Sequence, residues 1–311
     1  MSATLLTLSF RGDFELCRLL CRSVDEWVAP EIGHLLAVPR SDMALFAPLA
    51  GGRRRLVAEE ELLPRTLVKL PLPGQPWRAR LRLPRRNLYV SPRAGLVRGW
   101  IAQQIMKISG AARCGEDVIL HVDSDTTFIR PLDEGRLLAR GLPPLVRVPG
   151  ADDDDMHRPW HAAASRLLGL PDTGYHGADY IDSLVVWRPD TIRALLDHVG
   201  AVTARNPLDA LARMPAFSEY ILYGVFCDKV LGLPACGQVP VGRRLSAVVW
   251  IEEEWTDRRA PPRVPVEPHH LTAGIQSTLR MPFEFRERAY RDACALAAAQ
   301  DAEGRAVRTG S

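Results

Sequence analysis

Lysine is scarce in this chain of 311 residues. Of its 40 basic residues, only Lys69, Lys107 and Lys229 are lysines, and the other 37 are arginines. Alanine, proline and glycine are abundant as well, and the codons of all four frequent types are rich in G and C. We therefore expect the source to be a high-GC bacterial genome, in which codon bias does not account for the few lysines present.

Other features are missing, and each absence excludes a class of protein. None of the six cysteines forms a CxxC pair or a Cys/His cluster with zinc-ligand spacing. No apolar run approaches the roughly 20 residues that span a bilayer, and the start, MSATLLTLSFRGD, lacks the basic and apolar regions of a signal peptide. The net charge of +3 is too small to indicate a nucleic-acid partner. We expect a reduced, cytoplasmic protein without a transmembrane segment, and the oligomeric state stays open.

The first third of the chain has the alternation of an α/β fold. Residues 4–9 and 32–38 are short apolar segments typical of buried strands, and the helical pattern between them begins after Asp13. Ser41 and Asp42 are a plausible start for a second helix. This β-α-β-α order predicts a mostly parallel central sheet with helices on both faces.

The pattern continues along the chain. Alternation of Arg78, Arg80 and Arg82 predicts a half-exposed strand. We expect one domain over 1–290, followed by a terminal helix and tail over 291–311. Within the domain we expect strands at 117–122, near 145–148 and at 183–187, a short helix after Pro131, and longer helices over about 95–110, 157–168, 190–203 and 218–230.

Two aspartates follow the strand at 117–122. Asp123-Ser124-Asp125 therefore lies at the carboxyl end of a strand, where open α/β sheets bind ligands. Two carboxylates at that position are costly unless a cation lies between them, and Mg²⁺ or Mn²⁺ chelating a diphosphate suits them. The alternative is a pair of turn or helix-capping aspartates. A second Asp-x-Asp, in the run Asp152–Asp155, lies in a polar loop and is interpreted as a solvated acidic turn.

Five blocks occur in a fixed order: VPRSD (38–42), GWIAQQIMK (99–107), DSD (123–125), DYIDS (179–183) and SEYxxYG (218–224). This order resembles an uncharacterised bacterial glycosyltransferase-like family with the GT-A fold, a single Rossmann-like α/β domain. More distantly, residues 121–132 and 180–187 are similar to the glycogenin and lipopolysaccharide galactosyltransferase family, although Leu184 stands where that family has glycine. The resemblance implies a nucleotide-sugar and metal half over 1–130 and an acceptor half over 131–290.

The resemblance also implies donor-site residues. These are Thr7, Ser9, Asp13, Arg40 and Asp42 near the ends of the first two strands, Gln103, Gln104 and Lys107 on the helix before the metal strand, and Ser124 between the aspartates. Helix capping is the alternative role for Asp13 and Asp42. A polar outer helix face is the alternative for the residues at 103–107.

Catalytic and metal-binding residues follow from the same resemblance. It implies Asp182 and Glu219 as catalytic carboxylates, although Glu219 could instead be a carboxylate favoured at a helix N-terminus. It implies that Asp123 and Asp125 bind Mn²⁺ or Mg²⁺, with His270 or His269 as a further ligand. Three residues that open the helix at 157–168 either line the acceptor or pack in the core: His157, Trp160 and His161.

The predicted function is metal-dependent transfer of a sugar from a nucleotide-sugar, UDP-sugar in the first place, to a hydroxyl of an unknown small-molecule or glycan acceptor. One alternative is a nucleotidyltransferase acting on a sugar phosphate, which shares the fold and the metal carboxylates. Residues 7–13 have one glycine and no lysine, which disfavours it, because such enzymes carry a basic Gly-rich loop there. The other alternative is a non-catalytic nucleotide-sugar-binding protein, since binding and catalysis would use the same residues.

Overall fold

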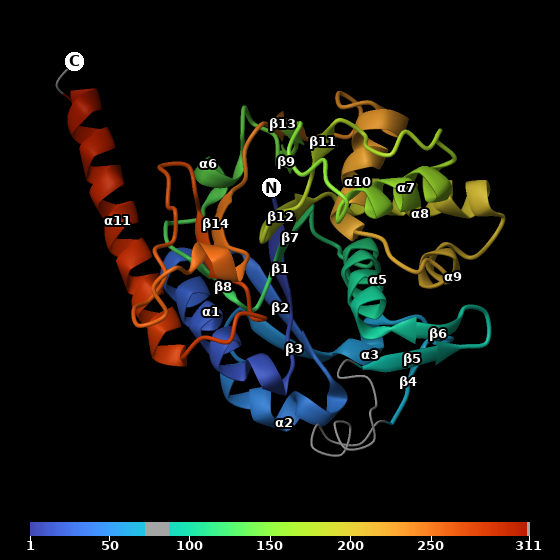
Figure 1. Cartoon of the computed structure of the whole chain (residues 1–311), viewed down its shortest axis with the longest axis horizontal. Helices are drawn as coiled ribbons and strands as arrows, with labels where there is room; N and C mark the ends of the chain where they lie inside the picture. The colour runs from blue at the N-terminus through green and yellow to red at the C-terminus, as the bar shows by residue number, and fades with distance from the viewer. Residues whose placement is uncertain (72–86, 310–311) are drawn as a thin grey trace.

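The structure is a computed structural model that describes residues 1–71 and 87–309, with side chains up to residue 305 (Figure 1). The strand predicted from Arg78, Arg80 and Arg82 lies outside the described residues.

The centre of the fold is a five-stranded sheet in the order β12-β7-β1-β2-β3. Four strands are parallel: β1 (Ala3–Leu8), β2 (Gly33–Val38), β3 (Arg54–Ala58) and β7 (Val118–Val122). The fifth strand, β12 (Leu184–Trp187), pairs with β7 in the antiparallel direction. The predicted α/β fold with a mostly parallel central sheet is confirmed.

Helices cover both faces of the sheet because successive side chains of each strand alternate between two cores. On one face, Leu5 and Leu120 pack with α1 (Phe14–Trp27). On the other face, Leu6 and Ile119 pack in a larger core with α5 (Gly99–Ala112). Figure 1 shows α1 and α5 on opposite sides of the sheet.

The larger core also contains most of the helices that follow α5 in the chain. These are α7 (Arg158–Leu168), α8 (Pro189–Thr203), α9 (Pro207–Ala212) and α10 (Glu219–Val225), which continues as a π-helical turn over Phe226–Leu231. The helices predicted over 157–168, 190–203 and 218–230 are confirmed, whereas the short α9 was not foreseen. Trp187 and Tyr223 stack in this core with their ring centroids 5.0 Å apart.

A second sheet lies beside the first. It consists of β14 (Ser246–Val249), β15 (Thr272–Ile275) and β8 (Thr126–Phe128), and β8 directly follows the Asp123–Asp125 turn. Helix α11 (Phe283–Thr309) packs on this sheet through a row of alanines that includes Ala293. The predicted terminal helix therefore exists, but it begins eight residues before the predicted start at residue 291.

The remaining elements are short. Two small two-stranded sheets are formed by β9 (Pro144–Val146) with β13 (Val239–Val241), which are parallel, and by β10 (Val148–Pro149) with β11 (Ala178–Asp179), which are antiparallel. A three-stranded sheet contains β4 (Val68–Lys69), β5 (Leu88–Ser91) and β6 (Gly95–Arg98). One-turn helices are α2 (Met43–Phe46), α3 (Glu59–Leu62) and α6 (Glu134–Leu137), with 3₁₀ turns at 11–13, 40–42, 47–49 and 252–254. Among the helices described, none is long and apolar enough to cross a membrane.

Candidate active site

The turn after β7 presents Asp123 to helix α5. Asp123 has the same parity along the strand as Ile119, whose side chain packs in the α5 core. The turn is fixed by two backbone hydrogen bonds, from Asp123 N to Ser183 O at 3.3 Å and from Thr126 N to Asp123 O at 3.1 Å. The strand end therefore holds the Asp123 carboxylate in one place, as the sequence predicts.

Lys107 is the centre of a charged cluster at this edge. Its ammonium lies 3.0 Å from Asp123 Oδ1, 3.1 Å from Glu219 Oε1 and 2.7 Å from the hydroxyl of Tyr220. Burial alone would lower the pKa of Lys107, but the neighbouring oxygens, Asp123 first, raise that pKa well above its ordinary value. Lys107 is thus a fixed positive charge that joins β7 to α10.

The three charged members of the cluster differ in access to solvent. The Lys107 side chain is 14% exposed and that of Glu219 is 6% exposed, whereas the Asp123 side chain is 38% exposed. A ligand that approaches this edge therefore meets Asp123 first.

Gln104 positions Glu219 from within the protein. The side-chain oxygen of Gln104 accepts a hydrogen bond from the backbone N–H of Glu219 at 2.8 Å, and the Ser218 hydroxyl caps α10 by accepting from Ile221 N. Because Gln104 is buried, it ties α5 to α10 rather than facing a donor, which differs from its predicted role. Gln103, by contrast, is exposed.

Asp125 lies behind Asp123, against the second sheet. Its Oδ2 accepts a hydrogen bond from Ser277 N at 2.6 Å. Burial, followed by the charge of Asp123, raises the pKa of Asp125 to about 6. Asp125 also lines a cavity of about 30 Å³, together with Arg286 of α11.

Asp13 joins this group across the sheet edge. It occupies the N-cap position of α1, but its side chain makes no cap hydrogen bond, so the alternative role of its carboxylate as a helix cap is wrong. Burial raises the pKa of Asp13, and Arg286 opposes that shift. Burial lowers the pKa of Arg286, and the charges of Asp125 and Asp13 oppose that shift. Asp13, Asp125 and Arg286 therefore interact electrostatically as one group.

Carboxyl groups gather at this edge, but among the described residues only Glu267, His269 and His270 bring three candidate ligand atoms within 4.8 Å of one another. Four carboxyl groups lie at this edge, on Asp13, Asp123, Asp125 and Glu219; Lys107 lies beside Asp123 and Glu219, and Arg286 interacts with Asp13 and Asp125. Oxygen donors and surplus negative charge are what Mg²⁺ and Mn²⁺ need.

Asp182 has an anchoring position. It is buried, and its two carboxylate oxygens accept hydrogen bonds from the backbone N–H groups of Ser183 and Leu245. Burial raises the pKa of Asp182 to about 6 in spite of these bonds. The carboxylate thus holds the start of β12 to β14.

The structure does not bring His269 and His270 to the carboxylate pair. In the β8–β15 ladder, Gly274 pairs with Thr126 and Thr272 with Phe128, so both histidines lie at the end away from Asp125. Ile275 lies beside Asp125. His270 is five residues from Ile275, which is roughly 17 Å at about 3.4 Å per residue, and His269 is one residue farther.

The two histidines form a different cluster with Glu267. The ligand atoms of these three residues lie within 4.8 Å of one another. However, the backbone N–H of Glu267 donates to His270 Nδ1 at 3.0 Å, which leaves the proton of the neutral ring on Nε2. Burial, followed by the charges of His269 and Arg130, lowers the pKa of His270 to about 4. A cation would have to displace that bond or that proton beside an arginine.

The remaining donor candidates divide between the interior and the surface. Thr7 is fully buried and its hydroxyl bonds His34 Nε2 at 3.1 Å, and Ser9 and Ser124 are buried as well. Arg40 is exposed, and its backbone N–H donates a hydrogen bond to the carboxylate of Glu60.

Asp42 connects the loops that follow β1 and β2. It accepts hydrogen bonds from the backbone N–H of Arg11 at 2.9 Å and from its side chain at 2.8 Å. Burial would raise the pKa of Asp42, but these bonds to Arg11 hold it below its ordinary value. Since Asp42 makes no side-chain cap bond, the helix-capping alternative is wrong here too.

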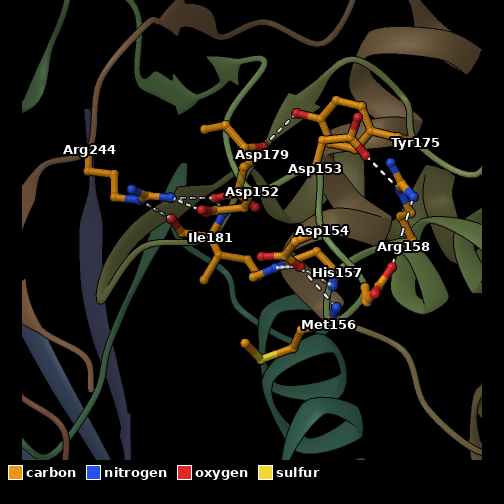
Figure 2. Close-up of polar contacts among 12 residues, drawn as sticks. Asp152, Asp153, Asp154, Met156, His157, Arg158, Tyr175, Asp179, Ile181 and Arg244 are labelled. Atoms are coloured by element: carbon orange, nitrogen blue, oxygen red, sulfur yellow. Dashed lines mark hydrogen bonds and ion pairs between the residues drawn. The ribbon is translucent and has the colours of Figure 1, made fainter. Parts of the chain in front are cut away.

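The acidic run Asp152–Asp155 lies in a turn whose last three aspartates are exposed, so the prediction of a solvated acidic turn is confirmed, although Asp152, Asp153 and Asp154 also pair with neighbouring side chains. Figure 2 shows Arg244 reaching both Asp152 and Asp179, with 2.9 Å to Asp179. Asp154 Oδ1 lies 2.7 Å from His157 Nδ1. Only the last aspartate of the run has a fully exposed side chain.

Comparison with known proteins gives a family. Residues 1–258 match the model of DUF6492, described as a family of unknown function. The chain belongs to this family. No curated protein matches the chain in sequence.

Among solved structures, the chain is similar to the apo form of mouse xyloside xylosyltransferase 1. The identity is 7% and the TM-score 0.47, over 91% of this chain and 100% of that chain. A likeness of this degree assigns no activity to the present protein.

Part of the site lies beyond the segment that matches the family. Ser277 and Arg286, which contact or face Asp125, follow residue 258. Sequence reasoning missed Arg286 because its helix was predicted to begin only at residue 291. It also passed over Tyr220, although this residue adjoins Glu219 in the SEYxxYG block.

Proposed function

We propose that this protein is a metal-dependent glycosyltransferase of the GT-A type that moves a sugar from a nucleotide-sugar, with UDP-sugar as the first choice, to an acceptor hydroxyl. The observation that carries the proposal is the position of the Lys107 ammonium, 3.0 Å from Asp123 and 3.1 Å from Glu219. The cluster lies at the edge of the sheet where α/β folds bind ligands. The order of sequence blocks that resembles such enzymes supports the same reaction.

Asp123 and Asp125 would hold the cation, Mn²⁺ or Mg²⁺. Asp123 is half-exposed, and Asp125 is more enclosed, with its pKa raised to about 6. Both would provide carboxylate oxygens to the cation, which would relieve the repulsion between their like charges. When bound, the cation would neutralise charge on the two phosphates of the donor. Asp13, which interacts electrostatically with Asp125, is the better candidate for additional support than either late histidine.

Lys107 would provide fixed positive charge beside that diphosphate. Its ammonium is held by three oxygens, so it does not need to reorganise when negative charge develops on the leaving phosphate. Preorganised charge of this kind is usually the largest contribution to catalysis.

Glu219 would serve the sugar and the acceptor. Its carboxylate shares Lys107 with Asp123 and is fixed by α10, so it can stabilise a cation-like sugar carbon or accept the proton of the attacking hydroxyl. We prefer Glu219 to Asp182 because backbone N–H groups already occupy both oxygens of Asp182. We assign the donor mainly to residues 1–130 and the acceptor mainly to 131–290.

The test is release of UDP from a panel of UDP-sugars, with Mn²⁺ or with EDTA. We expect release with at least one sugar, which EDTA abolishes and which Asp123→Asn reduces by at least about 100-fold. Asp155→Asn is the matched control, because Asp155 is a fully exposed aspartate outside the site. Pyrophosphate release from a nucleoside triphosphate and a sugar phosphate, without UDP release, would instead identify a nucleotidyltransferase.

A further inference from the structure

Helix α5 has one open stripe. Between Trp100 and Ala111, every side chain is buried except those of Trp100, Gln103 and Lys107. These three occupy positions i, i+3 and i+7, which lie on one face of a helix. At 1.5 Å per residue, the stripe runs for about 10 Å and ends at the Lys107 cluster.

An aromatic pair lies at the far end of this stripe. The rings of Trp100 and Trp160, from α5 and α7, have centroids 5.5 Å apart and are tilted by 40°. Both tryptophans are half-buried: each packs on one side against the larger core and keeps part of its surface exposed. The pair therefore has little freedom to move.

Polar groups flank the pair. The His157 ring meets Trp160 edge-on, with centroids 4.9 Å apart. Asp154 holds His157 by its backbone N–H at 2.9 Å and its Nδ1 at 2.7 Å (Figure 2). Gln103, three residues after Trp100 on α5, is exposed, and its amide provides hydrogen-bond donors and an acceptor.

We infer that Trp100 and Trp160 form a subsite for a pyranose ring of a glycan acceptor. The assignment of this pyranose ring to the acceptor, and not to another sugar ligand, rests on the proposed function. A pyranose has C–H groups on its faces and hydroxyls around its rim, so it matches aromatic faces bordered by an amide and an imidazole. The distance of about 10 Å from Lys107 separates this ring from the sugar being transferred.

The test uses saturation-transfer NMR with methyl β-glucoside, lactose and maltose as probes, sorbitol as a ringless polyol, and uridine. We expect signals from at least one saccharide and none from sorbitol. Trp160→Leu should reduce the saccharide signals at least fivefold, Trp160→Phe should keep them, and Gln103→Ala should weaken the saccharide affinity about fivefold. Because Gln103 is exposed, its substitution tests the subsite without a risk to folding.

Trp27→Leu is the matched control, since Trp27 is a half-buried tryptophan on the opposite face of the sheet and should not affect the signals. Equal saccharide signals in wild type and Trp160→Leu, or none in wild type, would overturn the inference. Uridine signals that disappear in Trp160→Leu would also overturn it, in favour of a nucleoside subsite. UDP release by the wild type decides the proposed function separately, so saccharide binding without UDP release would leave the subsite and remove the transferase.

Discussion

The two ends of the β8–β15 ladder carry ionisable groups in opposite conditions. At one end, Asp125 accepts one backbone N–H, from Ser277, and faces the like charge of Asp123. At the other end, Arg130 is 1% exposed and donates to Asp301 at 2.9 Å and to the backbone oxygens of Glu267 and His270. The Asp125 end has surplus negative charge. At the Arg130 end, the guanidinium has its hydrogen-bond acceptors in place, and we call that end saturated.

The difference shows that residue type alone does not define a site. His269, His270 and Glu267 are common metal ligands, yet the Glu267 N–H already uses Nδ1 of His270 and Arg130 adds positive charge. The carboxylates at the Asp125 end have fewer partners and more like charge. We therefore expect ligand binding at that end and structural support at the other.

The largest effect should follow Asp125→Asn. Removing this charge while keeping its shape should lower activity with a UDP-sugar at least about 100-fold. The melting temperature should not fall, because the substitution removes repulsion from Asp123 in the free protein. Activity assays with a Mn²⁺ titration and a melting curve measure both quantities.

The other end of the ladder supplies the control for that experiment. His269→Gln should leave activity and its Mn²⁺ dependence within about twofold of wild type, because the register places His269 six residues, or roughly 20 Å, from the Asp125 end of the ladder. Loss of Mn²⁺ dependence in His269→Gln would reverse the comparison.

The next effect concerns stability at the saturated end. Arg130→Met should lower the free energy of unfolding by about 2–3 kcal/mol, because buried carbonyl oxygens lose their donor. Arg136, which is 37% exposed and also pairs with Asp301, is the matched control, and Arg136→Ala should cost less than about 1 kcal/mol. Urea unfolding measures both variants, and equal costs would contradict a saturated, buried Arg130.

Sequence reasoning predicted much of the fold, because that part depends on local periodicity. The strands at residues 4–9 and 117–122 and the helix over 157–168 follow from apolar spacing and appear where expected. It also identified Asp123, Lys107 and Glu219, which the structure brings together.

What sequence reasoning could not provide was register and partnership. The pairing of β15 with β8 moves His270 away from Asp125, and nothing in the local pattern near residue 270 specifies that pairing. Likewise, Gln104 and Gln103 look equivalent in the sequence, yet only their positions on α5 decide that one is buried against Glu219 and the other exposed.

Lys107→Met tests whether surplus negative charge at Asp123 attracts the cation. Without the ammonium, Asp123 has one cation fewer, so the affinity for Mn²⁺ should rise, whereas kcat/KM should fall about 30-fold, or roughly 2 kcal/mol. Free Mn²⁺ measured by electron paramagnetic resonance reports the first quantity. Lys229→Met is the control, because Lys229 is 37% exposed and its ion pair, at 3.3 Å, is with its neighbour Asp228, away from Asp123 in the sequence. Unchanged Mn²⁺ affinity in Lys107→Met would place the cation away from Asp123.

The smallest expected effect, and the most specific, is that of Glu219→Gln. The amide keeps the shape of the side chain, and the backbone bonds to Gln104 and the Ser218 cap keep α10 in place. The substitution therefore removes charge at the proposed position of the reacting sugar carbon with little change in structure. We expect kcat to fall about tenfold, or roughly 1.4 kcal/mol of barrier, with donor KM and melting temperature nearly constant.

Glu15→Gln is the matched control, because Glu15 also lies in the first turn of a helix but is exposed and paired with Arg18. If Glu219→Gln keeps the wild-type kcat, its carboxylate serves only to hold Lys107. Asp182→Asn would then be the next variant to measure, because Asp182 is also a buried carboxyl group near the end of β7.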